Sequence, residues 1–487
     1  MSSDRPVIVW FRQDLRLADN PALAAAVASG RPIVPLYILD EGSPDLRPGI
    51  RPLGGASRWW LHQSLAVLAA DLRGHGLKLA LRRGAATDVL ENLVTEAGAG
   101  QVVWNRCYEP GAIARDTAVK AMLRDAGVAA ASFNGSLLVE PWKIETGQGG
   151  PYKVFTPYWK RLRALFQAPP VADVPDTLPA ARDVPGDDLD AWALLPTTPD
   201  WAGGLRETWR VGEDAARARL ADFLDAAVAD YPGDRDRPDR AGTSRLSPHL
   251  HFGEIGPHQV WRAASAAMAA GGAVATGAEA LLRELAWRDF NHHLLFHFPR
   301  IATANWRAQF DGFPWRDDPA ALAAWQRGQT GYPLVDAGMR ELWHTGFMHN
   351  RVRMIVGSFL IKDLMIDWRE GEAWFWDTLV DADLANNAGN WQWVAGSGAD
   401  ASPFFRIFNP VTQGEKFDPA GAYVRRWVPE LAALPDKWVH KPWAAATDVL
   451  ADAGVILGET YPAPMVDHGV ARNRALAAYK VMRNATV

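Results

Sequence analysis

The chain has 487 residues, 48% hydrophobic and 22% charged, which is the composition of a globular protein of two or three domains at about 100–200 residues each. Its formal net charge of −5 excludes a surface that is basic throughout, so any nucleic-acid contact must come from a local basic patch. The single Cys107 excludes an intramolecular disulfide and a four-cysteine zinc or iron–sulfur site, and it indicates a reducing compartment.

The sequence contains no run of about 18 uncharged apolar residues, and its polar N-terminus does not resemble a signal peptide. We therefore expect a cytoplasmic protein without membrane contact, and we predict no metal site. The 23 tryptophans, against nine tyrosines, are unusually many, and burial in a helical core is the default explanation for most of them.

Residues 6–135 alternate between strand-like and helix-like segments. Strands are predicted over 7–11, 33–39, 77–81, 101–104 and 128–133, with helices over 57–72, from 86 and over 114–126. This alternation is typical of a Rossmann-like, doubly wound parallel sheet, which offers a ligand crevice at the carboxyl edge of its strands. The first turn, Arg12 to Asp19, lacks the G-x-G-x-x-G fingerprint, which disfavours an NAD-type dehydrogenase.

A long connector and a helical region follow. Residues 168–204 are rich in proline and aspartate and lack periodicity, which indicates a surface connector. Beyond Leu205 apolar residues recur at spacings of three and four, which predicts helices over 211–228, 256–270, 278–298, 319–327, 332–345, 351–367, 369–379 and 471–483. The predicted fold class is α/β plus all-α, with an α/β domain over 1–135, a connector over 136–204 and a helical domain over 205–487.

Several segments of the helical region are dense in polar groups. In Gly242-Thr-Ser-Arg-Leu-Ser-Pro248, Ser247 is predicted to cap a helix that Pro248 starts, and the hydroxyls could also hold a phosphate. Glu284 and Arg288 are four residues apart, the spacing of an exposed ion pair. Asp381 and Asp383 could form a turn or hold a divalent metal.

These segments carry a specific resemblance to the photolyase/cryptochrome family, and most of all to its bacterial cyclobutane pyrimidine dimer photolyases of class I or class III type. The resemblance is nearly continuous over residues 231–470, while the N-terminal part is similar mainly in Val9-Trp-Phe-Arg-Gln-Asp-Leu-Arg16. The matching motifs are Thr243-Ser-Arg-Leu-Ser-Pro248, Trp287-Arg-Asp-Phe290, Thr330-Gly-Tyr-Pro-Leu-Val-Asp-Ala337, Met348-His-Asn-Arg-Val-Arg-Met354, Asn390-Trp-Gln-Trp393 and Arg406-Ile-Phe-Asn-Pro410.

The resemblance implies noncovalent FAD, active as FADH⁻, in the helical domain. It implies an ion pair between Arg353 and Asp381 beside the flavin and places Asn387 opposite flavin N5, where plant-type cryptochromes usually have aspartate and animal-type ones cysteine. The residues implied to bind the cofactor are Tyr231, Thr243, Ser244, Arg245, Leu246, Ser247, Arg288, Asn350, Arg353, Asp381, Asp383 and Asn387.

The resemblance also implies a pocket for a pyrimidine dimer flipped out of DNA. Trp287 and Trp393 would be its walls, and Glu284 would hydrogen-bond a pyrimidine carbonyl. Photolyases of the (6-4) type have histidines in this pocket. Here the equivalent positions are Asn350 and Met354, and His349 would point about 100° away from Asn350 on a helix. The surface residues implied to contact DNA are Arg235, Arg351, Gln413 and Lys416.

Further implied roles concern electron supply and light harvesting. Trp391, Trp368 and Trp315 match the chain that reduces photoexcited flavin, whereas Trp374 and Trp376 could form a side branch or simply pack in the core. An antenna chromophore is expected, methenyltetrahydrofolate rather than a deazaflavin, with Glu109 as an acidic contact or as an ordinary loop residue.

The sequence thus predicts a monomeric carbon–carbon lyase that uses light to repair cyclobutane pyrimidine dimers in UV-damaged DNA. The alternative is a cryptochrome-like blue-light receptor without repair activity. A thermal flavin oxidoreductase that uses NAD(P)H is disfavoured by the missing fingerprint.

Overall fold

The computed structural model describes residues 5–41, 51–171, 174–401 and 405–485. These residues form two compact units between which the chain crosses several times. The sheet unit comprises Met1–Trp201, Trp209–Ala229 and Ser244–Pro299, and the helical unit comprises Ala202–Thr208, Asp230–Thr243 and Arg300–Val487. The predicted domain boundaries, 1–135, 136–204 and 205–487, stay a prediction. They divide the chain into consecutive stretches, whereas each unit of the structure groups segments that are close in space.

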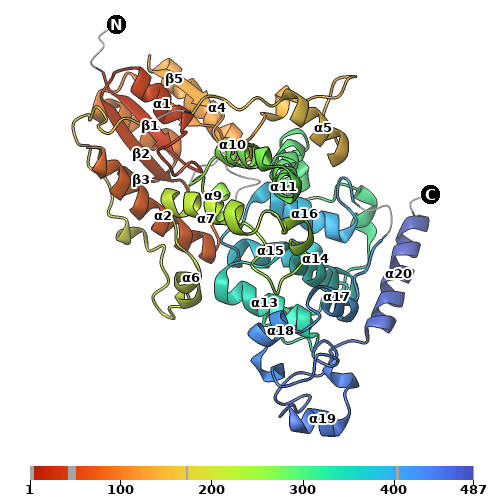
Figure 1. The fold of residues 1–487 in the computed structure, drawn as a ribbon. Coiled ribbons are helices and arrows are strands. Elements are labelled where there is room, and N and C mark those ends of the chain that lie inside the picture. The colour runs from red at the N-terminus through yellow and green to blue at the C-terminus, as the bar shows by residue number, and fades with distance from the viewer. Residues whose placement is uncertain (1–4, 42–50, 172–173, 402–404, 486–487) are drawn as a thin grey trace. The chain divides into compact units, whose positions relative to one another are not determined.

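The sheet has five parallel strands in the order β3-β2-β1-β4-β5, as predicted for a doubly wound fold (Figure 1). All residues of β1 and β2 are buried, so both faces of the sheet centre are covered. The strands are β1 Val7–Phe11, β2 Ile33–Leu39, β3 Ala80–Arg83, β4 Gln101–Asn105 and β5 Ala129–Phe133.

The third strand begins later than predicted. The Leu77 N–H donates to the Leu72 carbonyl at 2.8 Å and so closes the preceding helix, and pairing with β2 starts only at Ala80. The predicted strand over 77–81 was therefore misplaced by about three residues, because the end of the helix decides where the strand can start.

Helices cover the sheet. Helices α3 (Ala86–Ala97) and α4 (Pro110–Asp125) pack on each other and, with Ile8 and Trp10 of β1, enclose one core. Helix α1 (Pro21–Ala28) packs against β1 and β4. The remaining helices of the sheet unit are α2 Gly55–Gly74, α5 Phe155–Leu165, α7 Glu213–Ala226, α9 Ser247–His251, α10 Pro257–Ala267 and α11 Gly272–His297.

The proline-rich part of the predicted connector, from residue 168 on, is irregular where the structure describes it, apart from the 3-10 turn Asp190–Trp192, and it is fixed to the sheet unit. The wider range 136–204 also contains helix α5, which was not predicted. Ala180 forms a parallel bridge with Ile33 at the start of β2, ahead of the point where β3 begins to pair, and the Asp187 N–H donates to the Leu81 carbonyl at 2.8 Å. The connector thus satisfies backbone groups that β3 leaves open.

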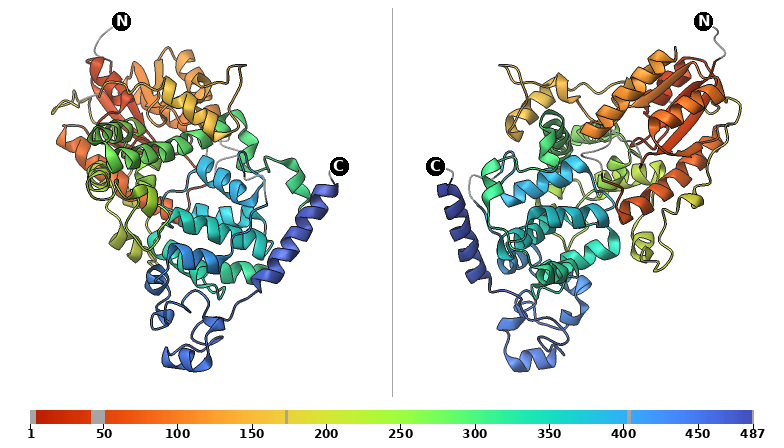
Figure 2. Two further views of the ribbon diagram at one scale, coloured as in Figure 1. Left: turned by 45° about the vertical axis from the view of Figure 1, so that its right-hand side comes forward. Right: turned by 180° about the vertical axis from the view of Figure 1, so that it is seen from behind.

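The helical unit is built around α13 to α16, whose buried side chains form its large apolar core (Figure 2). Across the described residues, no helix combines the length and hydropathy needed to cross a bilayer. The helices of this unit are α6 Gly203–Thr208, α8 Tyr231–Asp234, α12 Pro319–Gln326, α13 Pro333–Thr345, α14 Asn350–Ser358, α15 Trp368–Thr378, α16 Leu384–Ala395, α17 Pro410–Phe417, α18 Ala422–Trp427, α19 Thr447–Asp452 and α20 His468–Ala485.

Helices α17, α18 and α19 were not predicted, and two further helix predictions for this unit need correction. The single helix predicted over 351–367 is α14 followed by a π-helical turn, Phe359–Asp363. The helical run ends before Met365, whose φ of 59° no right-handed helix contains. Helix α16 was missed, since Asn386, Asn387, Gly389 and Asn390 are weak helix formers. Tertiary contacts override both local preferences.

Candidate functional site

The hydroxyl segment, Thr243 to Ser247, leads into α9; Thr243 belongs to the helical unit, and Ser244 to Ser247 belong to the sheet unit. The helix begins at Ser247 itself, with Leu246 as the N-cap residue, so the prediction that Ser247 caps the helix was wrong. Arg245 has a φ of 51°, and its guanidinium lies 5.1 Å from the centre of the Trp209 ring. Because α9 has only five residues, an anion here would depend on side chains and local turn geometry rather than on a long helix dipole.

A buried trio anchors α9. His249 Nδ1 lies 2.5 Å from Glu254 Oε2, and Trp60 Nε1 of α2 donates to Glu254 Oε1 at 3.0 Å. All three side chains are fully buried. No sequence pattern indicates this trio, because Trp60 and Glu254 are 194 residues apart. It fixes the helix that follows the hydroxyl segment.

Helix α11 presents Glu284, Trp287 and Arg288 on one face, at the i, i+3 and i+4 positions. The Trp287 ring is stacked on Phe155 of α5, with ring centroids 3.6 Å apart and planes inclined by 8°. Arg288 Nη1 donates to the Ser136 carbonyl at 2.6 Å, so its guanidinium is held by backbone and does not depend on an exposed ion pair with Glu284. This face is therefore a rigid, aromatic wall beside a half-buried carboxylate.

Asp289 anchors the same helix from its opposite side. It is 1% exposed and accepts hydrogen bonds from the Leu138 and Val139 N–H groups at 2.6 and 3.4 Å. Burial raises the pKa of Asp289 to about 6, although Arg288 opposes the shift. The Asp289 carboxylate therefore joins α11 to the segment over 136–139, in which the Ser136 carbonyl accepts from Arg288.

In the helical unit, the two aspartates before α16 have separate partners. Asp381 forms the predicted ion pair with Arg353, with Nη2 to Oδ2 and Oδ1 distances of 2.9 and 3.1 Å. Asp383 is the N-cap of α16 and accepts from the Asn386 N–H at 2.8 Å. Of the two alternatives from the sequence, a turn or a metal ligand pair, these contacts favour the turn, which here leads into α16.

Asn387 is buried on α16 and is oriented by α15. Its Nδ2 donates to Glu372 Oε1 at 2.9 Å and to the Glu372 carbonyl at 3.0 Å. With the amide nitrogen used in this way, the Asn387 Oδ1 is the group left for a ligand. Glu372 was not predicted as a site residue, because its role appears only once α15 and α16 pack together.

The predicted lesion and DNA residues of the helical unit lie on α8, α14, α16 and α17. Asn350 and Met354 share a face of α14, and Trp393 is half-buried on α16, as Gln413 is on α17. His349 is the N-cap of α14 rather than a helical residue, and its Nδ1 accepts from the Arg351 N–H at 3.2 Å. The prediction that His349 turns away on a helix was thus wrong in geometry.

The three basic residues predicted to contact DNA each lie beside an aromatic ring of this unit. The Arg351 guanidinium and the Lys416 ammonium lie 4.6 and 5.0 Å from the Phe417 ring centre, and Arg351 also pairs with Asp236 at 2.7 Å. Arg235 lies 5.7 Å from the Tyr231 ring centre. The structure therefore brings Arg351 and Lys416 together on one ring, a local basic patch within an acidic chain.

Trp391, Trp368 and Trp315 belong to one apolar cluster of the helical unit. Trp391 is 4% and Trp368 0% exposed, and Trp315 is half-buried. Trp368 Nε1 donates to Asn305 Oδ1 at 2.9 Å. A Cβ at Gly371 would lie 2.2 Å from the Trp391 ring, so that close approach requires glycine.

The two further tryptophans of α15 also lie in this unit. Trp374 is stacked on Trp343, with ring centroids 6.0 Å apart and planes inclined by 8°, and Trp343 is 56% exposed. Trp376 packs against the core cluster. Trp374 therefore has an aromatic neighbour that reaches the surface, as a side branch requires.

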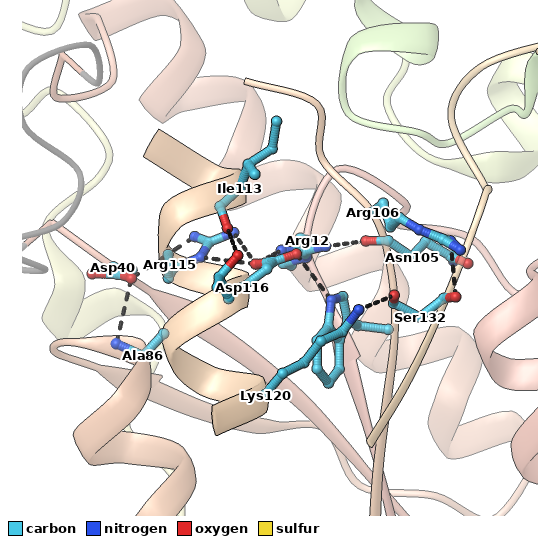
Figure 3. Close-up of polar contacts among 12 residues, drawn as sticks. Arg12, Asp40, Ala86, Asn105, Arg106, Ile113, Arg115, Asp116, Lys120 and Ser132 are labelled. Atoms are coloured by element: carbon cyan, nitrogen blue, oxygen red, sulfur yellow. Dashed lines mark hydrogen bonds and ion pairs between the residues drawn. The ribbon is translucent and has the colours of Figure 1, made fainter. Parts of the chain in front are cut away.

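The carboxyl edge of the sheet is filled by the chain's own side chains (Figure 3). Arg12 follows β1 and pairs with Asp116 of α4 at 2.7 Å, and the Arg12 and Arg115 guanidiniums lie 4.7 and 4.9 Å from the Trp10 ring centre. Arg12 is 7% exposed. Among the described residues, a buried ion pair thus lies at the edge where the ligand crevice was expected, and Glu109 is 9% exposed at the N-cap of α4.

A cavity of about 300 Å³ lies elsewhere in the sheet unit, between α5, α10 and α11. Two indole rings line it, Trp159 and Trp261, whose centroids are 6.1 Å apart. Phe166 supports Trp261 from 4.6 Å. The other residues that line it are Arg163, Ser265, Met268, Glu279 and Leu282.

Comparison with known proteins shows to which protein family the chain belongs. A DNA photolyase family model matches residues 7–179, and a model of the FAD-binding domain of DNA photolyase matches residues 281–481. The chain belongs to the photolyase/cryptochrome family.

Individual relatives are similar along the whole chain. A deoxyribodipyrimidine photo-lyase of Agrobacterium fabrum is 54% identical over 482 residues, which cover 99% of each chain. The crystal structure of a bacterial class III photolyase from Agrobacterium tumefaciens has a TM-score of 0.95 at 52% identity, again with 99% of each chain covered. Cryptochrome-2 of Arabidopsis thaliana is 38% identical over all of this chain and 81% of its own length.

Proposed function

We propose that the protein is a flavin-dependent photolyase that uses light to repair cyclobutane pyrimidine dimers in DNA. The observation that carries this proposal is the buried Asn387, whose amide nitrogen is bound to Glu372 so that its oxygen is free to accept from a ligand. An amide adds no charge beside an anionic reduced flavin, whereas aspartate would repel it. The similarity to photo-lyases over 99% of the chain supports the same function.

The side chains fit FAD. Ser244 and Ser247 offer hydroxyls to phosphate and ribityl oxygens, and the Arg353–Asp381 pair offers charge beside a flavin ring. Asn387 Oδ1 is an acceptor for an N–H group. The other residues that we assign to this cofactor are Tyr231, Thr243, Arg245, Leu246, Arg288, Asn350 and Asp383.

The lesion would lie against Trp287 and Trp393, outside the duplex. Trp287 has no freedom to rotate away, because Phe155 is stacked on it at 3.6 Å. FAD, when bound, would supply light-driven one-electron chemistry, and Trp287, Trp393 and Glu284 would hold the dimer during it. Glu284 would hydrogen-bond a pyrimidine carbonyl, where negative charge develops on the lesion. Asn350 and Met354 offer no acid, so the pocket suits ring splitting without proton transfer.

Electron supply to the resting enzyme would pass from Trp315 through Trp368 to Trp391. Arg235, Arg351, Gln413 and Lys416 would hold the DNA backbone, with binding that weakens as salt rises. The enzyme would act as a monomer, since one chain supplies every residue assigned here.

We further propose that a second, planar chromophore stacks in the Trp159–Trp261 cavity. Its volume of about 300 Å³ and its two indole walls suit a heteroaromatic ring such as that of a methenyltetrahydrofolate. Glu109 is the other candidate contact. The filled carboxyl edge of the sheet argues against a flavin-like antenna there.

A cryptochrome-like receptor is the second candidate, favoured by the identity to Arabidopsis thaliana cryptochrome-2. The deciding experiment illuminates chemically reduced protein with two oligonucleotides, one with a cyclobutane dimer and one with a (6-4) photoproduct. We expect repair of the cyclobutane dimer alone. In Glu284→Ala the repair yield should fall by about tenfold, for loss of one charge-assisted hydrogen bond, with flavin content unchanged. Repair of neither lesion would favour the receptor, and repair of the (6-4) product alone would overturn the assignment of the pocket.

A further inference from the structure

Lys362 is a buried cation that the proposed mechanism does not use. It lies in the π-helical turn Phe359–Asp363 and is 1% exposed. Its Nζ donates to the Val394 carbonyl at 2.7 Å and also to the Arg406 carbonyl. A buried ammonium is costly, and two backbone acceptors do not supply a counter-charge.

The position of Lys362 relates it to the tryptophans. Val394 lies three residues after Trp391, on the same helix. On the other side, the Lys362 ammonium lies 4.7 Å from the Phe405 ring centre, Phe405 is 5.9 Å from Phe313, and Phe313 is 4.5 Å from Trp315. Lys362 therefore lies between α16, the helix that carries Trp391, and the aromatic cluster that contains Trp315.

We propose that the Lys362 ammonium opposes positive charge on the neighbouring tryptophans, so that its protonation state sets how long an oxidised tryptophan persists after illumination. The inference rests on the proposed electron supply through Trp391, Trp368 and Trp315. In this scheme Lys362 tunes the return of the electron to the tryptophans and is not a catalytic residue, since Lys362 touches neither the cofactor nor the lesion.

The charge balance of the step is simple. Light moves one electron from Trp391 to the bound cofactor, and electrons from Trp368 and then Trp315 refill the inner positions. The positive charge ends on Trp315, which loses its indole proton to water or takes an electron from an external reductant. A nearby ammonium in an apolar interior raises the energy of each cationic tryptophan, so that return of the electron becomes faster.

The surroundings make the charge of Lys362 variable near neutral pH. Burial lowers the pKa of Lys362 to about 7, with Asp363 acting against the shift and Arg406 with it. The charged groups around it are Asp363 on its own turn, Arg406 on the 405–409 segment, and His468 and Arg474 on α20. His468 Nδ1 of α20 lies 2.5 Å from Asp363 Oδ1, whereas Arg474 donates at 2.6 Å to the backbone carbonyl of Asp363, so α20 engages one of the two carboxylate oxygens of Asp363.

The test is flash photolysis of the FAD-loaded, oxidised protein, in which the decay of the tryptophan radical is measured. The pH is varied from about 6 to about 8.5, a range that includes the ordinary histidine pKa and stays below the pKa of free lysine. In the unmodified protein we expect the radical lifetime to increase roughly threefold or more as the pH rises and the ammonium is lost. Lys362→Met should show the long lifetime at every pH. Lys362→Arg keeps its charge and should show the short lifetime throughout.

Two outcomes would overturn the inference in distinguishable ways. A radical that forms normally but decays identically in the unmodified protein, Lys362→Met and Lys362→Arg at all pH values removes Lys362 from electron return and leaves the proposed function intact. Absence of any tryptophan radical removes the proposed electron supply as well. The pH series of the unmodified protein requires no substitution, so poor folding of a variant does not prevent the test.

Discussion

Asn387 is bound twice by Glu372: its Nδ2 donates both to the carboxylate, at 2.9 Å, and to the backbone carbonyl, at 3.0 Å. Glu372 is fully buried on α15 and Asn387 is 8% exposed on α16. The orientation of the asparagine that distinguishes the proposed repair site is thus set by a residue on the neighbouring helix.

Replacing Glu372 should therefore disturb Asn387 specifically. We expect Glu372→Leu to cost about 1–3 kcal/mol of stability, because the buried Asn387 amide loses one of its two acceptors, and to lower the repair yield. Glu372→Gln keeps the Oε1 acceptor and should retain most of the yield. Repair per bound flavin, measured for both variants, checks this. Equal yields in the two variants would show that Glu372 does not orient Asn387.

Trp391→Phe should separate electron supply from repair. We expect photoreduction of the oxidised flavin by an external reductant to slow by about tenfold or more, since one relay step is removed, while chemically reduced enzyme keeps its repair rate. The matched control is Trp325→Phe, because Trp325 lies 6.3 Å from Trp391 in the same core but outside the predicted relay. If both substitutions slow photoreduction equally, packing rather than electron transfer explains the effect.

The pKa of Asp289 predicts a pH dependence of stability. The folded state holds this proton up to about pH 6, whereas the ordinary value is 3.8. The stability that the protonated group contributes is therefore full below about pH 4 and is lost as the pH rises to about 6.

Asp289→Asn cannot titrate and keeps an acceptor for the Leu138 N–H. Relative to the unmodified protein, its free energy of unfolding should increase by up to about 3 kcal/mol between pH 4 and pH 7. Urea unfolding at both pH values measures this, with Asp214→Asn as the control, since the Asp214 side chain is 98% exposed. Parallel pH curves for all three proteins would contradict the assignment.

The location of a second chromophore can be tested by two substitutions. Trp261→Ala removes one wall of the cavity and should weaken binding of the antenna chromophore by about tenfold, with flavin content unchanged. Glu109→Ala should leave it bound. The absorption spectra of the two purified variants give the answer, and loss of the antenna band only in Glu109→Ala would move the site to the edge of α4.

The alternation of segments up to residue 135 was sufficient to predict the five-stranded parallel sheet, because side-chain periodicity is a local property of the chain. The motifs from Thr243 onward identified the family, and the predicted Arg353–Asp381 ion pair is present. Periodicity failed where a backbone conformation sets the end of an element: the Leu77 N–H closes α2, so that β3 starts only at Ala80, and the helix predicted over 351–367 ends before Met365, which adopts a left-handed conformation.

The supports of the candidate site appear only in the tertiary structure. These supports are partners that lie far apart in sequence or on different elements: Glu372 beside Asn387, Phe155 beside Trp287, Trp60 and Glu254 beside His249, and Lys362 at the Val394 carbonyl of α16. Residue types alone do not determine such pairs. A buried polar group needs a hydrogen-bond partner, but the packing of the helices decides which residue becomes that partner.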